Sequence, residues 1–144
     1  MIKTAFTTSA LVVASLLLAT PSYAGGDAAV ERQSLMKLNG GATRTLAGMV
    51  KGQAPVDAEK AQAAMNILNA AALGFGYMFP EGSQTGAETE AAPAIWSDRA
   101  GFDAAVAKYV KDTTATITDM DSLKAAFGAA ASNCGSCHKA YRTK

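Results

Sequence analysis

Residues 123–142 read LKAAFGAAASNCGSCHKAYR, and this stretch holds both cysteines and the only histidine of the 144-residue chain. Its apolar residues recur every three or four positions, which is the spacing of one face of an amphipathic helix. Cys134, Cys137 and His138 continue that spacing. The stretch therefore predicts a last helix that carries two thiols and one imidazole together.

Three stretches upstream show the same helical periodicity. The first has apolar residues from 35 to 49 and ends at Gly52 and Pro55. The second opens at Asp57, a residue type that caps helices, and its apolar face continues to Phe79. These signals predict two helices separated by a short connection.

A third helix is predicted to begin at Pro93, because proline suits the first turn of a helix. Its apolar face extends through Thr113 to Ile117, and the sequence TDMDS then turns the chain into the last helix. Residues 79–93 contain two prolines, two glycines and no apolar period, so they are predicted to form a loop.

Four helices with two short connections and one longer loop favour an antiparallel four-helix bundle. No convincing run of alternating strand residues occurs in the sequence, so the fold class is predicted to be all-α. Gly40, Gly41 and Gly48 stand inside the first helix, where each costs about 1 kcal/mol relative to alanine. They fit either a tolerant helix surface or the close approach of a neighbouring helix or a large flat ligand.

The first 26 residues, MIKTAFTTSALVVASLLLATPSYAGG, have the features of a secretory signal peptide. Lys3 precedes an apolar run, and small residues stand at Ser22 and Ala24. The run is too short for a membrane-spanning helix. We therefore predict a signal peptide over residues 1–24 and one domain over residues 25–144, exported and, in a bacterium, periplasmic, with no membrane insertion after cleavage.

Removal of Lys3 with this peptide leaves 12 basic and 12 acidic side chains, a net charge of zero. Proteins that bind nucleic acid carry a basic stripe for the phosphate backbone. Nucleic acid is therefore not expected as a partner.

The spacing Cys-x-x-Cys-His restricts what these residues can do. A disulfide between Cys134 and Cys137 would close a tiny loop and stabilise little. A catalytic pair of the thioredoxin-like kind is placed after a strand at a helix start, whereas this pair is predicted to lie inside the last helix. Zinc would need further Cys or His ligands, which the sequence lacks. On one helix face, however, two thiols can add to the two vinyl groups of a porphyrin, and the imidazole of His138 can bind its iron. The motif is the attachment signature of haem c, so one covalent haem is predicted.

Together with this motif near the C-terminus, five segments resemble the class II cytochromes c, which comprise cytochrome c′ and its low-spin, methionine-ligated relatives. They are ERQSLMK, MVKGQAP, MFPEGSQTG, APAIWSDRAGFDA and LKAAFGAAASNCGSCHKAYR, and they cover essentially the whole chain after the signal peptide. The resemblance implies a four-helix bundle with covalently bound haem.

The resemblance also implies further cofactor-binding residues. Arg32 matches a position near the haem propionates, Gln33 lies beside the haem, Met36 matches the position above the distal face, and Arg142 matches a basic residue on the proximal side. His138 and Met36 are the metal-ligand candidates. Met36 could equally be core filler, and Arg142 could complement the dipole of its own helix.

Two functions stay open at this point. If Met36 binds the iron opposite His138, the haem is six-coordinate and low-spin, and the protein exchanges electrons with periplasmic redox proteins. If Met36 only covers the distal face, the iron is five-coordinate and binds NO or CO. We favour electron transfer, and no enzymatic activity is expected, because a peroxidase would need another acid–base group beside the iron. The resemblance also implies a homodimer through the first two helices.

Overall fold

The computed structural model describes residues 25–143, with side chains from residue 28 onward. The signal peptide predicted over residues 1–24 lies outside the described residues. The elements are α1 (Gly25–Val50), α2 (Ala58–Phe75), the 3-10 turn η1 (Gly76–Met78), α3 (Ala94–Ser97), α4 (Arg99–Asp112) and α5 (Met120–Tyr141). The described chain contains no strand beyond one isolated bridge, so the all-α prediction is confirmed.

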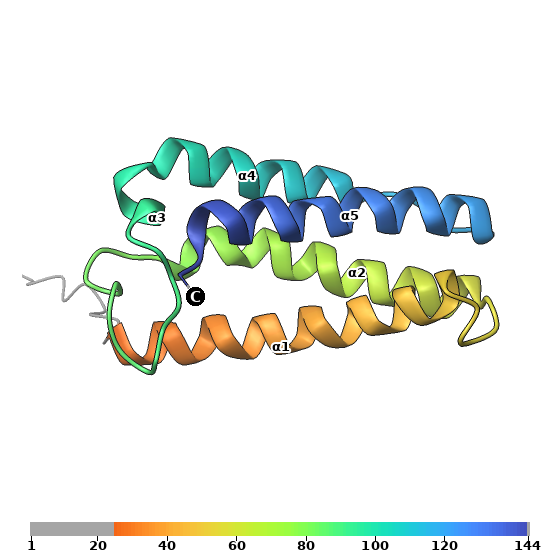
Figure 1. The fold of residues 1–144 in the computed structure, drawn as a ribbon, viewed down its shortest axis with the longest axis horizontal. Coiled ribbons are helices and arrows are strands. Elements are labelled where there is room, and N and C mark those ends of the chain that lie inside the picture. The colour runs from red at the N-terminus through yellow and green to blue at the C-terminus, as the bar shows by residue number, and fades with distance from the viewer. Residues whose placement is uncertain (1–24, 144) are drawn as a thin grey trace, which may run out of the picture.

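The four long helices run alternately up and down along a common axis (Figure 1). Contacts between α1 and α2, α2 and α4, α4 and α5, and α5 and α1 close these helices into a ring. This arrangement is the predicted antiparallel four-helix bundle. Within the described part of the chain, no helix has both the length and the apolar character needed to cross a membrane.

The apolar core is divided between the two ends of the bundle. An aliphatic cluster fills one end; its buried members are Ala42, Leu46, Met49, Ala61, Ala64, Met65, Leu68, Ile117, Leu123, Ala126 and Ala130. An aromatic cluster around Phe79, Ile95 and Phe102 fills the other end. The two clusters leave a stretch of the bundle between them that is not packed by large apolar side chains.

That stretch lies between α1 and α5. The first half of α1 buries only Ala28, Ala29 and Arg32 among its described residues, and α5 has no buried residue after Asn133. Apolar packing between these two helices is therefore interrupted on the side that carries the Cys-x-x-Cys-His motif.

The prediction of a single third helix from Pro93 to Ile117 is wrong. The chain breaks at Asp98, between α3 and α4, because the Asp98 side chain accepts a hydrogen bond from the backbone N–H of Gly101 at 3.2 Å and starts a new helix. Thr113 and Ile117 are buried as expected, but they lie beyond the end of α4.

Polar side chains of α2 take over the backbone groups at the end of α4. Asn69 Nδ2 donates to the backbone oxygen of Val110 at 3.0 Å, and the backbone N–H of Ile117 donates to Gln62 Oε1 at 2.7 Å. Phe79 is likewise not helical: α2 ends earlier, and Phe79 follows η1 into the aromatic cluster. Pro80 comes next, and the residue before a proline avoids helical geometry.

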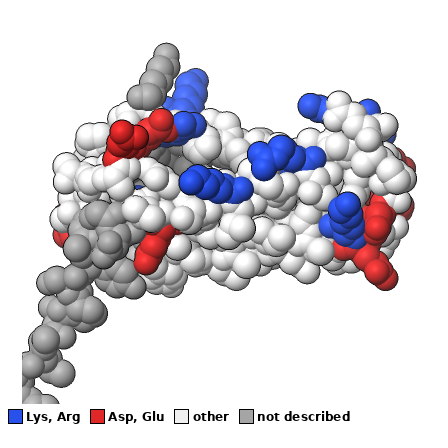
Figure 2. All heavy atoms as spheres, turned by 90° about the horizontal axis from the view of Figure 1, so that it is seen from below, with Lys and Arg blue, Asp and Glu red and all other residues white. Residues whose placement is uncertain are grey.

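Charged side chains are unevenly distributed over the bundle. Residues 32–56, which include most of α1, have four basic side chains and no acidic one, whereas residues 81–121 have eight acidic and three basic ones. The face seen from the α1 side shows basic side chains over its middle and acidic ones towards its two ends (Figure 2). The balanced total charge therefore conceals a separation of charge.

We expect the substitution Gly101→Ala to weaken the junction between α4 and α5. An added Cβ would lie 2.7 Å from Tyr141 Oη and closer still to the Asp98 carboxylate. Tyr141 Oη donates to Asp98 Oδ2 at 3.0 Å, so both this bond and the cap of α4 are disturbed. Urea unfolding should show a loss of about 1–2 kcal/mol, the cost of a lost N-cap.

Gly128→Ala on α5 is the matched control, because nothing lies within 4 Å of its added Cβ. There alanine should raise the free energy of unfolding by up to about 1 kcal/mol, because it favours the helix more than glycine does. Equal effects of the two substitutions would contradict the role of the junction.

Candidate haem site

Cys134, Cys137 and His138 lie near the C-terminal end of α5. Residues three and four positions apart share one face of a helix, so the structure brings the two thiols and the imidazole together as expected. The start of this helix is fixed by a capping box that Asp119 and Ser122 form. Both cysteines are half-buried and carry free thiols.

The protein environment keeps these three groups neutral. Burial raises the pKa of both thiols, and the charge of Cys134 adds to the effect on Cys137. His138 is an exposed residue, but partial burial of its imidazole lowers the pKa, the positive charge of Arg142 lowers the pKa further, and Glu90 opposes both effects. The imidazole is therefore uncharged near pH 7, which is the form that binds a metal ion.

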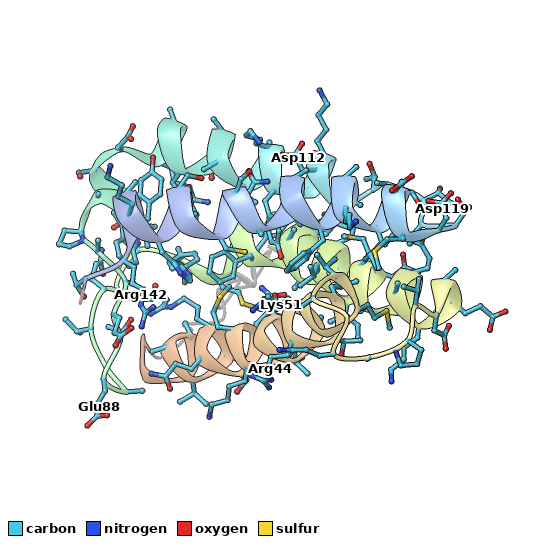
Figure 3. The ribbon with its side chains drawn as sticks, turned by 45° about the vertical axis from the view of Figure 1, so that its right-hand side comes forward. Arg44, Lys51, Glu88, Asp112, Asp119 and Arg142 are labelled. Atoms are coloured by element: carbon cyan, nitrogen blue, oxygen red, sulfur yellow. The ribbon has the colours of Figure 1, made fainter. Side chains whose placement is uncertain are left out.

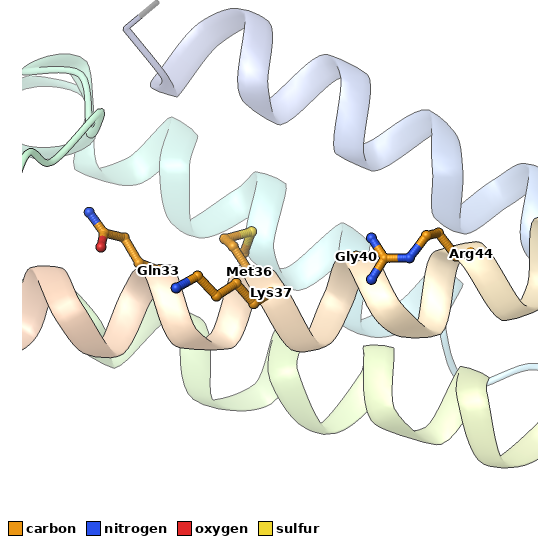
Figure 4. A pocket seen from close by; sticks show the side chains of 5 residues that line it. All are labelled: Gln33, Met36, Lys37, Gly40 and Arg44. Carbon is orange, nitrogen blue, oxygen red and sulfur yellow. The ribbon is translucent and has the colours of Figure 1, made fainter.

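A cavity of about 390 Å³ lies along α1 on the side of the neighbouring α5. The side chains of Gln33, Met36, Lys37, Gly40 and Arg44 line it, and the Arg44 guanidinium reaches back over Gly40 (Figure 4). An added Cβ on Gly40 would meet only that guanidinium, at 3.6 Å. No neighbouring helix crowds this glycine, which leaves a tolerant helix surface or the close approach of a flat ligand as its explanation.

Met36 is half-buried in the cavity wall. The one hydrogen bond to its sulfur among the described residues is weak, since Asn39 Nδ2 lies 3.9 Å from Sδ. The sulfur lone pairs are therefore not committed to a strong partner within the protein.

Two buried side-chain oxygens have no hydrogen-bond partner within the described part of the chain, and both adjoin this region. Asn39 Oδ1 belongs to the residue that contacts Met36. Burial raises the pKa of Tyr109, and Cys134 is close enough that its thiolate form, once ionised, would raise the pKa further. Buried polar atoms are seldom left unpaired. The position of these two atoms, beside the motif and beside the cavity, fits a site built for a bound group.

The donors present also fit a haem. Two adjacent thiols can form the thioether links, and the neutral imidazole and the thioether of Met36 are the two axial donors found in cytochromes c.

Arg32 does not face solvent: 5% of it is exposed. Its guanidinium donates to Met78 O at the end of η1, at 2.9 Å, and to three oxygens of the 79–93 loop, which are Ser83 O at 3.0 Å, Ser83 Oγ at 3.1 Å and Thr89 Oγ1 at 3.2 Å. It also lies 4.8 Å from the centre of the Phe79 ring. In the structure, Arg32 therefore fastens the loop to α1.

Gln33 and Arg142 hold the same loop. Gln33 Nε2 donates to Ala87 O at 2.6 Å, and Arg142 forms an ion pair with Glu90. The loop passes across the end of the bundle where Arg142 lies, with Glu88 at its outer edge (Figure 3). Three of the predicted haem-binding residues thus tie α1 and α5 to one loop, which closes the end of the space between these helices.

Several residues of the site were not predicted from the sequence. Lys37 and Arg44 lie on the same face of α1 as Gln33, so helical spacing from Gln33 could have found them, whereas Gly40 is one of the glycines already considered for the approach of a flat ligand. No local signal pointed to the others, which are Asn39, Ser83, Thr89, Glu90 and Tyr109.

A four-helix bundle that carries Cys-x-x-Cys-His at the end of its last helix, beside a cavity along its first helix, has the architecture of a helical c-type haem protein. The family model described as Cytochrome C′ matches residues 27–142. The chain belongs to the cytochrome c′ family, the class II c-type cytochromes.

Individual relatives agree with this membership. Cytochrome c′ of Rhodopseudomonas palustris is 38% identical over 82% of this chain and 83% of its own, and cytochrome c-556 of Agrobacterium fabrum is 36% identical over 96% of this chain and 95% of its own. A solved structure of the Rhodopseudomonas palustris protein superposes with a TM-score of 0.78, over 82% of this chain and 97% of the other, at 38% identity.

Variants of cytochrome c′ from Alcaligenes xylosoxidans have been solved with bound nitric oxide and with bound carbon monoxide. They are each 33% identical to this chain, with TM-scores of 0.72 and 0.73, and cover 82% of this chain and 95% of their own.

Replacing Arg32 with methionine should release the 79–93 loop. The variant leaves buried oxygens of Ser83 and Thr89 without their donor, so the free energy of unfolding should fall by about 2–4 kcal/mol. Hydrogen exchange of the amides at residues 83–89 should accelerate. Gln33→Ala, which removes one exposed hydrogen bond to the same loop, should cost only about 0.5–1.5 kcal/mol. An equal cost for both variants would contradict the role of the buried guanidinium.

Proposed function

We propose that this protein is a periplasmic electron carrier with one haem c, attached through Cys134 and Cys137 and ligated by His138 and Met36. The haem supplies a one-electron redox centre when bound. The protein supplies attachment, two axial donors and exclusion of water.

The observation that carries the proposal is the position of Met36. Its thioether lines the cavity along α1, on the side of the helix where α5 carries the Cys-x-x-Cys-His motif. Its sulfur has one weak contact, with Asn39. A thioether so placed can bind the iron from the side opposite His138, and His/Met ligation raises the reduction potential of a haem.

The loop fastened by Arg32, Gln33 and Arg142 supports the same proposal. It covers the end of the space between α1 and α5 and holds these helices at a fixed separation. Fixed axial donors favour electron transfer, because the coordination of the iron then changes little when it gains or loses an electron.

The remaining parts of the proposal concern location and assembly. The sequence of residues 1–24 supports export, and c-type haem is attached outside the cytoplasm. Leu38 on α1 and Ile67 and Leu73 on α2 are exposed apolar residues, which supports a homodimer through these two helices. Since His138 is the only histidine, we propose a carrier rather than a peroxidase-like enzyme.

A second candidate function is the binding of NO or CO at a vacant distal position. The gas complexes of the Alcaligenes xylosoxidans relative favour it. In this alternative Met36 is an apolar lid over a five-coordinate iron, and His138, Cys134 and Cys137 keep their roles.

Replacing both Cys134 and Cys137 with alanine should make the haem extractable into acidified organic solvent, because no thioether bond then holds it. The parent haem should stay with the protein under the same treatment. Extraction of haem from the parent would contradict covalent attachment.

Met36→Leu and Met36→Ala together decide between the two functions. If Met36 is a ligand, both variants lose the iron–sulfur bond, so each should change from a low-spin to a high-spin absorption spectrum and bind CO when reduced. Leucine keeps most of the side-chain volume, which separates ligation from packing.

The lid alternative predicts a different pattern. The parent would then be high-spin and bind CO, Met36→Leu would resemble it, and only Met36→Ala would bind CO faster. That pattern would replace the electron-carrier proposal with the gas-binding one.

A further inference from the structure

Three basic residues form a row along α1 and the first residue after it, Lys51, whose backbone N–H still donates to Ala47 O at 2.9 Å as in a helix. Lys37, Arg44 and Lys51 are seven positions apart, so they lie within about 40° of one another around the helix. They are exposed, and the segment 32–56 contains no acidic residue. We call these three residues the α1 basic row; it extends over about 21 Å.

The basic row is not neutralised by the protein. The ion pairs within residues 28–143 are Arg99 with Asp103, Lys108 with Asp112, and Arg142 with Glu90, so none involves the row. Basic side chains are also the ones seen over the middle of this face (Figure 2). An exposed row of unpaired charges creates a positive potential that attracts an anionic surface.

The row adjoins the candidate haem site. Lys37 and Arg44 line the same cavity as Met36, on the solvent side of that residue along α1. A partner that contacts these two side chains would therefore lie close to the edge of the bound haem, where electron transfer is shortest.

The opposite charge lies elsewhere in the protein. The acidic excess of residues 81–121 belongs to the 79–93 loop, with Glu81, Glu88 and Glu90, and to residues at helix starts, which are Asp98, Asp119 and Asp121. A molecule with balanced total charge and such a separation orients itself in the field of an approaching charged surface. An acidic surface would therefore be attracted to the middle of the α1 side, where the basic side chains lie.

We propose that the α1 basic row is the docking surface for an acidic redox protein. In the encounter, one electron passes between the haem iron and a one-electron centre of that protein; whichever centre loses the electron is oxidised, the other is reduced, and no bond is made or broken. The inference rests on the proposed electron-carrier function and deepens it by assigning the surface and the charge of the partner.

A protein surface fits the row better than a membrane does. Anionic membranes are recognised by clusters of four to eight basic residues or by an amphipathic helix, whereas the row has three charges spread along a rigid helix. The homodimer proposed above leaves the row accessible, because Leu38 is rotated by about 100° around α1 from Lys37.

The test compares two charge-reversed double variants of the haem-loaded protein. Lys37→Glu/Arg44→Glu changes the row, and Lys60→Glu/Lys111→Glu makes the same change in net charge at exposed positions on α2 and α4. Binding to a carboxylate-terminated monolayer, measured by surface plasmon resonance at low ionic strength, should weaken at least about tenfold for the first variant. The control should stay within about twofold of the parent.

Electron transfer is the second readout. Stopped-flow oxidation of the reduced protein by hexacyanoferrate(III), a small trianion, should slow about tenfold in the row variant but not in the control, and the difference should vanish at high salt. Lys51 lies outside the cavity, and the single variant Lys51→Glu should weaken monolayer binding by about twofold to threefold. It therefore tests the row even if Lys37→Glu/Arg44→Glu disturbs the haem.

Equal effects of the row and control variants in the binding measurement would overturn the docking proposal. So would binding to phosphatidylserine vesicles that is tighter than binding to the monolayer, because the surface would then recognise lipid. Failure of the electron-carrier function appears separately, in the parent, as a high-spin spectrum that changes with CO before any charge is altered.

Discussion

A positive charge buried at the end of the bundle organises the surroundings of the site. The Arg32 guanidinium donates to four oxygens between Met78 and Thr89, and no carboxylate of the described residues forms an ion pair with it. Burial of an unpaired charge is costly unless its donors are satisfied. Arg32 can therefore stay buried only while the loop provides acceptors, and the buried oxygens of Ser83 lose this donor if Arg32 is removed. The burial also lowers the pKa of the guanidinium, though arginine keeps its proton at any physiological pH. The loop in turn reaches α5 through Glu90 and Arg142, so a single local interaction links the first helix, the long connection and the helix with the haem-attachment motif.

The division of the core into two clusters has a functional consequence. Aliphatic side chains hold one end of the bundle and aromatic side chains hold the other, so the middle of the α1–α5 interface does not have to be filled by the protein itself. Large apolar residues at positions such as Gly40 would close this space, whereas the glycine leaves room beside Met36. A haem placed there would complete the apolar packing between α1 and α5. The fold would thereby obtain stability from its cofactor, and the cofactor would be held in a fixed position between the two helices.

The two proposals concern different distances from the iron. His138 and Met36 determine whether the iron exchanges electrons or binds a gas, and that choice depends on one sulfur atom. The α1 basic row acts over the longer range of electrostatic attraction and determines which partner approaches, and from which side. Both depend on α1, which contributes Met36 and the row from neighbouring faces of the same helix. A change in the position of α1 would therefore alter ligation and recognition together.

The helical fold and the haem-attachment motif could be predicted from local features of the sequence, because apolar periodicity and the spacing of Cys134, Cys137 and His138 are properties of single helices. The candidate residues Arg32, Gln33, Met36 and Arg142 followed from family resemblance, but their contacts did not.

Tertiary structure decided that three of them hold the 79–93 loop, because their hydrogen-bond partners lie 46 to 57 residues away in the sequence. It also decided where α4 ends, since Asn69 of α2 donates to the backbone oxygen of Val110 and Gln62 of α2 accepts from the backbone N–H of Ile117. The sequence by itself determined the period of each helix and the chemistry of the motif. The partners of each polar side chain depended on which helices became neighbours. Local periodicity carries no information about which helices become neighbours, so only the tertiary structure decided these partners.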